Sequence, residues 1–76
     1  MKVFDKVKEF ILIQLPISDD KVTMEAALVD DLGADSANLM MLIMDLETEY
    51  DLTVEDDVLG SIKTVGDIVN YIEAHI

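Results

Sequence analysis

Apolar residues recur at helical spacing in the first fifth of the chain, with charged residues between them. The recurring positions are Val3, Val7, Phe10, Ile11 and Leu15. Spacings of three and four place such side chains on one face of an α-helix. Pro16 should end the helix, because proline lacks an amide donor and disfavours helix in the residue before it. The pattern therefore predicts a first helix from residue 3 to about residue 15.

The next segment, residues 16–34, shows no sustained period and is expected to be a long connection. Ser18 is placed to cap a short turn at residues 19–22. Leu28 and Leu32 are expected to attach the connection to the core. A loop this long is unusual in a small domain and is often functional.

A second helix is predicted from Asp35–Ser36 to about residue 50, with Asp35 as its N-cap. Its apolar face consists of Leu39, Leu42, Ile43, Leu46 and Tyr50. A short third helix is predicted over residues 56–60, ended by Gly60.

The last helix is marked at its start by Thr64 and Asp67, which stand three apart as in a capping box. Its apolar face consists of Val65, Ile68, Val69 and Ile72. We therefore expect an all-α fold, a small bundle of three longer helices and one short helix with a long first loop. Residues 1–76 are expected to form a single domain.

Charge narrows the classes of partner. The chain has 76 residues, 17 acids and 5 bases, for a net charge of -12, and no cysteine. This field repels nucleic acid and anionic membranes and attracts basic protein surfaces, although an acidic excess also serves solubility. No stretch reaches the roughly 18 to 20 apolar residues of a membrane span, and the opening lacks the pattern of a signal peptide. We expect a soluble, cytoplasmic monomer.

The segment Asp30-Asp31-Leu32-Gly33-Ala34-Asp35-Ser36 holds the candidate site. Because Asp35 is the better cap, the Ser36 hydroxyl should be free to point outward. The chain has one histidine and no cysteine, so no nucleophile and base are paired for catalysis, and we expect no enzyme activity. Glu55-Asp56-Asp57 lacks the ligand spacing of a calcium loop, and no metal site is predicted.

This segment resembles the surroundings of the modified serine in acyl carrier proteins of fatty acid synthesis. Residues 42–50 and 62–72 resemble the second and last helices of the same family, so the likeness covers nearly the whole chain in order. The resemblance implies that a phosphopantetheinyl transferase attaches 4'-phosphopantetheine from coenzyme A to Ser36, with Mg²⁺. The arm's thiol would then carry acyl groups as thioesters to acyl-loading and acyl-processing enzymes.

The family can fold the acyl chain back between its helices. Candidate lining residues are Leu46, Val54, Ile62, Ile68 and Tyr71. The alternative interpretation of each of them, and the one that a single position favours, is ordinary core.

Two departures from the family pattern stand out. Ala37 and Asn38 follow the serine, where the family usually has leucine and then an acid. Farther along, Met40 replaces a small aliphatic residue, and Met41 and Thr48 replace acids. The candidate partner-binding residues are Asp35, Ala37, Met40, Met41, Met44, Glu47 and Asp51. A methionine cluster suits varied partners, unless one or two of these methionines pack into the core.

Two alternatives to a general carrier are left open. One is a specialised carrier for polyketide, nonribosomal peptide, lipid-modification or D-alanine transfer pathways. The other is an unmodified acidic module that binds proteins. The intact Asp35-Ser36 pair argues against the second alternative.

Overall fold

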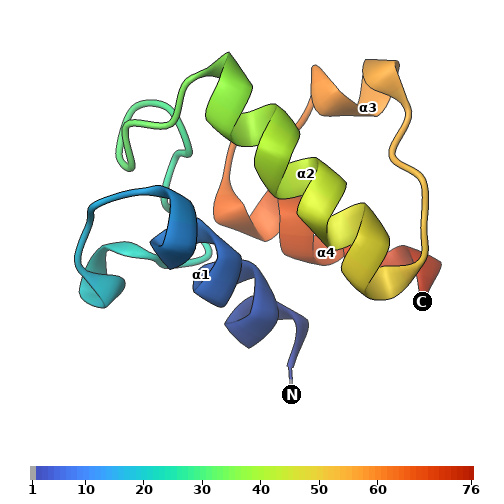
Figure 1. Ribbon diagram of the computed structural model, residues 1–76, viewed down its shortest axis with the longest axis horizontal. Helices are drawn as coiled ribbons and strands as arrows, with labels where there is room; N and C mark the ends of the chain where they lie inside the picture. Colours follow the sequence, from blue (N-terminus) through green and yellow to red (C-terminus); the bar gives the residue numbers. More distant parts are fainter. Residues whose placement is uncertain (1) are drawn as a thin grey trace.

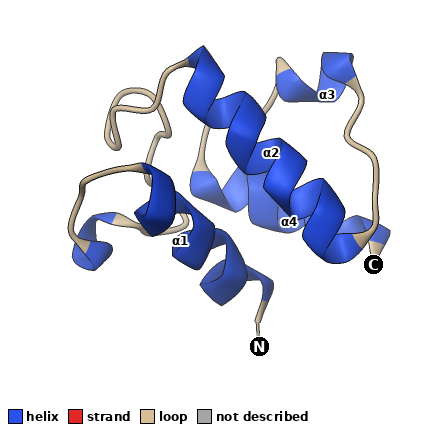
Figure 2. Ribbon diagram, in the orientation of Figure 1, coloured by secondary structure: helices blue, strands red, loops and turns tan. Residues whose placement is uncertain are grey.

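A computed structural model describes residues 2–76. Figure 2 shows helices joined by loops, with α1 at Val3–Gln14, α2 at Ser36–Tyr50, α3 at Asp56–Leu59 and α4 at Val65–His75. A 3-10 turn, η1, covers Asp19–Lys21. Within residues 2–76 the only extended pairing is an isolated bridge between Ala27 and Thr64. The expected all-α bundle of three longer helices and one short helix is confirmed.

The helix ends agree with the local signals, with one correction. Asp35 and Thr64 cap α2 and α4, and each belongs to a complete capping box. Ser18 is different, because its side chain makes no capping hydrogen bond. Backbone groups close this turn instead: the amide of Lys21 donates to the Ser18 carbonyl oxygen at 3.1 Å. The turn is also shorter than the predicted residues 19–22.

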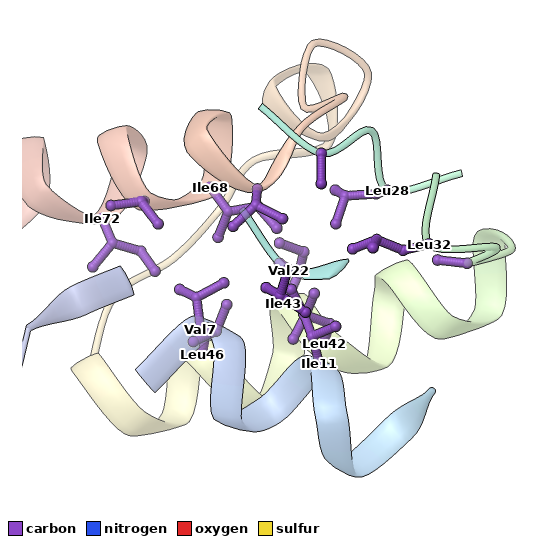
Figure 3. Packing of buried hydrophobic residues seen from close by; sticks show 14 of the residues in the cluster. Val7, Ile11, Val22, Leu28, Leu32, Leu42, Ile43, Leu46, Ile68 and Ile72 are labelled. Atoms are coloured by element: carbon purple, nitrogen blue, oxygen red, sulfur yellow. The ribbon is translucent and has the colours of Figure 1, made fainter. Parts of the chain in front are cut away.

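The core forms between α1, α2 and α4. Figure 3 shows Val7 and Ile11 of α1, Leu46 of α2 and Ile72 of α4 pointing into a common interior. The long connection also contributes buried residues to this interior. They are Val22, Ala26, Leu28, Leu32 and Ala34. The prediction that Leu28 and Leu32 attach the connection to the core is therefore confirmed.

Backbone hydrogen bonds fasten the same connection to the start of α4. The amide of Leu28 donates to the Lys63 carbonyl at 2.9 Å, and the amide of Gly66 donates to the Met24 carbonyl at 2.8 Å. Gly33 then turns the chain with a φ of 76°, a value that side-chain-bearing residues seldom adopt. The connection thus delivers Asp35 and Ser36 to the start of α2.

Figure 1 shows where the start of α2, which carries Ser36, lies relative to the other helices. The start of α2 and the short helix α3 lie at the same end of the bundle, while α1 and α4 lie side by side away from it. Of the helices described, α1 to α4, none is long and apolar enough to cross a membrane.

Candidate functional site

Ser36 is the first residue of α2, and its neighbours leave its hydroxyl unused. The amide of Asn38 donates to Asp35 Oδ1 at 2.8 Å, and the amide of Asp35 donates to Asn38 Oδ1 at 3.2 Å. The cap is therefore supplied on both sides of Ser36, which is exposed. Within residues 2–76 the Ser36 hydroxyl makes no hydrogen bond. Asn38, a departure from the family pattern, proves to be half of the capping box.

Gln14 ties the first two turns of α2 to the end of α1. In the orientation that satisfies both polar atoms, the Gln14 side-chain oxygen accepts from the Leu42 amide at 2.9 Å. Its nitrogen donates to the Asn38 carbonyl at 3.1 Å. The side-chain amide of Gln14 thus bridges the backbone of Asn38 and Leu42, which are four residues apart in α2. Through it, the position of Ser36 depends on α1 as well as on the preceding loop.

A cavity of about 250 Å³ opens directly beside Ser36. Its wall is formed by one face of α2 and by the end of α3 with the residues after it: Leu39, Met40, Ile43, Leu59, Gly60 and Ile62. Of these, only Ile62 was among the cavity candidates from the sequence. Positions three, four and seven after Ser36 share its helix face, and this spacing is the signal that would have found Leu39, Met40 and Ile43.

The five cavity candidates lie deeper, around a second and much smaller space. Leu46, Val54, Ile62, Ile68 and Tyr71 all line a space of about 10 Å³ that is less open than the first, the closed cavity. Such a volume has room for about one water molecule, so these side chains pack as core in this structure. Ile43 and Ile62 line both cavities, which makes them the wall between the open space and the closed one.

The outer face of α2 carries an exposed methionine surface, formed by Met40, Met41 and Met44. Their exposed fractions are 58%, 57% and 59%, so the alternative that one or two of them pack into the core is wrong. Ala37 and Asp51 are exposed as well. Asp51 ends α2 in the left-handed conformation, with a φ of 51°.

Glu47 lies on the same face but uses its carboxylate within the protein. The amide of Val54 donates to Glu47 Oε2 at 2.7 Å, across the loop between α2 and α3. Periodicity along a helix gives no indication of such a bond.

Across residues 2–76, no group of three or more acidic, histidine or cysteine side chains is placed to hold a metal ion.

Comparisons with known proteins agree with this arrangement. A family profile described as a phosphopantetheine attachment site matches residues 5–72. The chain is 51% identical over 72 residues to the acyl carrier protein of Thermotoga maritima, covering 95% of this chain and 89% of that protein. It is 47% identical over 73 residues to the acyl carrier protein of Clostridium perfringens, covering 96% of each chain. The solved acyl carrier protein of Enterococcus faecalis superposes with a TM-score of 0.84 over the full length of both chains, at 34% identity.

Proposed function

This chain belongs to the acyl carrier protein family, and we propose that Ser36 is the residue to which its 4'-phosphopantetheine is attached. The protein is a carrier in fatty acid synthesis and not an enzyme, and phosphopantetheine is its cofactor. One observation carries the assignment to Ser36: an exposed hydroxyl, left out of the capping box on either side of it, borders an apolar cavity.

The residues around Ser36 fit a phosphodiester-linked arm. When bound, phosphopantetheine supplies a terminal thiol that holds acyl groups as thioesters, a group that the chain itself lacks because it has no cysteine. The phosphate would lie at the amino end of α2, where the helix dipole favours negative charge. The Asp35 carboxylate next to it opposes this effect. The dipole therefore contributes little to the choice of Ser36, and exposure of the hydroxyl contributes more.

We propose that the acyl chain enters the bundle through the cavity beside Ser36. The open space and the closed cavity share two lining residues, Ile43 and Ile62, which stand between them. A short acyl end can occupy the outer space with these side chains in place. A longer one reaches Leu46, Val54, Ile68 and Tyr71 only when the side chains of Ile43 and Ile62 move and the wall of the small cavity beyond them, which includes Leu52 and Val54, also gives way.

The partners proposed are the phosphopantetheinyl transferase and the acyl-loading and acyl-processing enzymes, which meet the outer face of α2. The exposed methionine surface supports this placement, because an uncovered apolar patch on a small acidic protein marks a contact site. The absence of cysteine from the sequence suits a reducing compartment, and we propose a monomer acting in the cytoplasm.

A specialised carrier is the second candidate, and the same surface favours it. Met41 and Thr48 stand where the family tends to have acids, and Ala37 stands where it has leucine. A partner fitted to this face would need an apolar depression for Met40, Met41 and Met44 rather than a row of basic side chains.

Whole-protein mass spectrometry tests the assignment. Incubation with coenzyme A, Mg²⁺ and a broad-specificity transferase should add one phosphopantetheine to the wild type and none to Ser36→Ala. Ser18→Ala is the matched control, because Ser18 is also exposed and its side chain caps nothing. Modification that persists in Ser36→Ala would refute the assignment, and a wild type that gains no mass would favour the unmodified protein-binding module.

A further inference from the structure

The loop from α2 to α3, residues 51–55, depends on one residue of α2 for three of its hydrogen bonds. The carbonyl oxygen of Glu47 accepts from the amides of Asp51 and Leu52, the second at 3.1 Å. The carboxylate of Glu47 accepts from the amide of Val54 at 2.7 Å. A charged acceptor at this distance makes a stronger bond than a neutral one.

The opposite side of the loop is held from α4. The hydroxyl of Tyr71 donates to the carbonyl oxygen of Thr53 at 3.2 Å. Between these two attachments, Leu52 and Val54 turn inward and line the closed cavity. The loop is therefore one wall of the space that a long acyl chain has to enter. Glu47 holds this loop in place by accepting the hydrogen bond from the Val54 amide.

This geometry conflicts with a docking role for the Glu47 side chain. The face of α2 has few acids, and Glu47 and Asp51 were both candidates to meet basic enzyme surfaces. Glu47 is only partly exposed, and a basic side chain that paired with its carboxylate would compete with the Val54 amide. Asp51 is exposed, and within residues 2–76 its side chain makes no hydrogen bond. The two acids of this face thus differ: the Glu47 carboxylate accepts a hydrogen bond within the protein, and the Asp51 carboxylate does not.

We propose that Glu47 is a positioning residue for the acyl cavity: its carboxylate holds the loop that walls the cavity, and enzymes do not dock on its charge. The proposal rests on the proposed function, because it concerns the space in which the cargo is held. The same role for Glu47 predicts that binding a long acyl chain inside the bundle costs free energy. The closed cavity of about 10 Å³ admits an acyl chain only if a wall moves, and movement of this loop breaks the bond from Val54 to Glu47.

Three variants separate a hydrogen-bond acceptor from a docking charge. Glu47→Gln removes the charge but keeps an oxygen that can accept from Val54, whereas Glu47→Ala removes both. Asp51→Asn removes the other charge of the face, and asparagine tolerates the left-handed conformation found there. A docking role predicts that all three variants behave alike toward enzymes. The positioning role predicts that Glu47→Gln resembles the wild type and Glu47→Ala does not.

Amide hydrogen exchange of the unmodified protein provides the first measurement. The Val54 amide should exchange about tenfold faster in Glu47→Ala, the factor that corresponds to about 1.4 kcal/mol, and within about threefold of the wild type in Glu47→Gln. Amides of α4 such as that of Ile72 report global unfolding and serve as the internal reference. Equal Val54 exchange rates in Glu47→Ala and the wild type would overturn the proposal.

The second and third measurements use the transferase and the cargo. The KM of the transferase should be unchanged by Glu47→Gln; a KM raised equally by Glu47→Gln and Glu47→Ala would overturn the proposal in favour of docking. The rise in melting temperature from acetyl to dodecanoyl cargo should be larger in Glu47→Ala than in wild type and Glu47→Gln, because the bond that long cargo has to break is already absent. Equal rises would also overturn it. If the wild type accepts no phosphopantetheine, the proposed function fails, while the exchange rates still decide whether Glu47 holds the loop.

Discussion

Asp35 and Asn38 cap each other across the first turn of α2, each side chain accepting a hydrogen bond from the other's backbone amide, at 2.8 and 3.2 Å. Ser36 lies inside this pair without taking part in it. The residue before the serine and the residue two after it thus stabilise the helix start, and the hydroxyl between them is free for chemistry. Modification at Ser36 therefore does not have to break a structural bond.

Asp35→Ala should lower the free energy of unfolding by about 0.5–2 kcal/mol, the usual cost of losing an N-cap side chain. Ser36→Ala should change it by less than about 0.5 kcal/mol, as for surface positions without such a role. Urea denaturation followed by helical circular dichroism measures both. An equal loss in the two variants would show that Ser36 contributes to the cap after all.

Gly66→Ala should destabilise the fold by about 1–3 kcal/mol, because the new methyl group has no space. A Cβ built at Gly66 would lie 2.8 Å from the carbonyl oxygen of Met24, a backbone atom that already accepts from the Gly66 amide. Gly60→Ala is the matched control. Its added carbon would meet only the Asp57 carbonyl oxygen at 3.6 Å, and its φ of -65° suits alanine.

The control should gain about 0.4–1 kcal/mol, because alanine restricts the unfolded chain more than glycine does. Thermal or urea unfolding of the two variants against the wild type gives both values. A Gly66→Ala protein as stable as the wild type would mean that the Met24 segment yields easily and does not fix the start of α4.

Asp67 should make stability depend on pH in the acid range. Hydrogen bonds from the backbone amides of Lys63 and Thr64, at 2.9 and 3.1 Å, hold the pKa of the Asp67 carboxyl below its ordinary value of about 3.9. A group whose pKa is lower in the folded state contributes stability that is present above the unfolded pKa. That contribution is lost as the pH falls through the folded pKa.

The comparison of wild type with Asp67→Asn isolates this effect from the other acids. The wild type should melt at a higher temperature at pH 7, and the difference should shrink as the pH falls below about 4. Because Asp67 is exposed, solvent screening keeps the difference small. A difference in melting temperature that is the same at pH 7 and pH 3 would show that the charge of Asp67 does not matter.

Added salt should raise the melting temperature. The net charge of -12 makes repulsion between exposed carboxylates the main long-range term, and 0.1 M salt screens charges beyond about 10 Å. Salt also weakens surface pairs such as Lys6 with Glu49, 3.6 Å apart, but such pairs contribute little. Calorimetry in increasing sodium chloride measures the balance. A flat or falling melting temperature would show that repulsion does not limit stability.

Met44→Glu should weaken the complex with the proper partner enzyme, because a charge would replace an exposed apolar contact. Conversely, Met41→Glu combined with Thr48→Glu should improve acceptance by enzymes of general fatty acid synthesis, which the family meets with acidic helix residues. Steady-state kinetics of the loaded variants with both sets of enzymes provide the test. If the wild type already serves the general enzymes fully and the added acids change nothing, the methionine surface does not select partners.

Much of the structure of this protein depends on local interactions and could be predicted from its sequence. Helix starts follow from Asp35 and Thr64, since a cap bonds to an amide only three residues away. Pro16 restricts the chain next to it, and α1 ends with Gln14, close to the predicted residue 15. The role proposed for Ser36 also depends on a short segment, because one neighbour supplies the cap and leaves the hydroxyl unused.

Only the tertiary structure decided which distant residues meet. The cavity beside Ser36 needs Leu59 and Gly60, more than twenty positions along the chain, and no period relates them to α2. The bond from Val54 to Glu47 likewise depends on how the loop folds back, and no helical spacing indicates that the Glu47 carboxylate accepts a hydrogen bond within the protein. Spacing along a helix fixes which face a side chain shares, but the packing of separate segments fixes what that face touches.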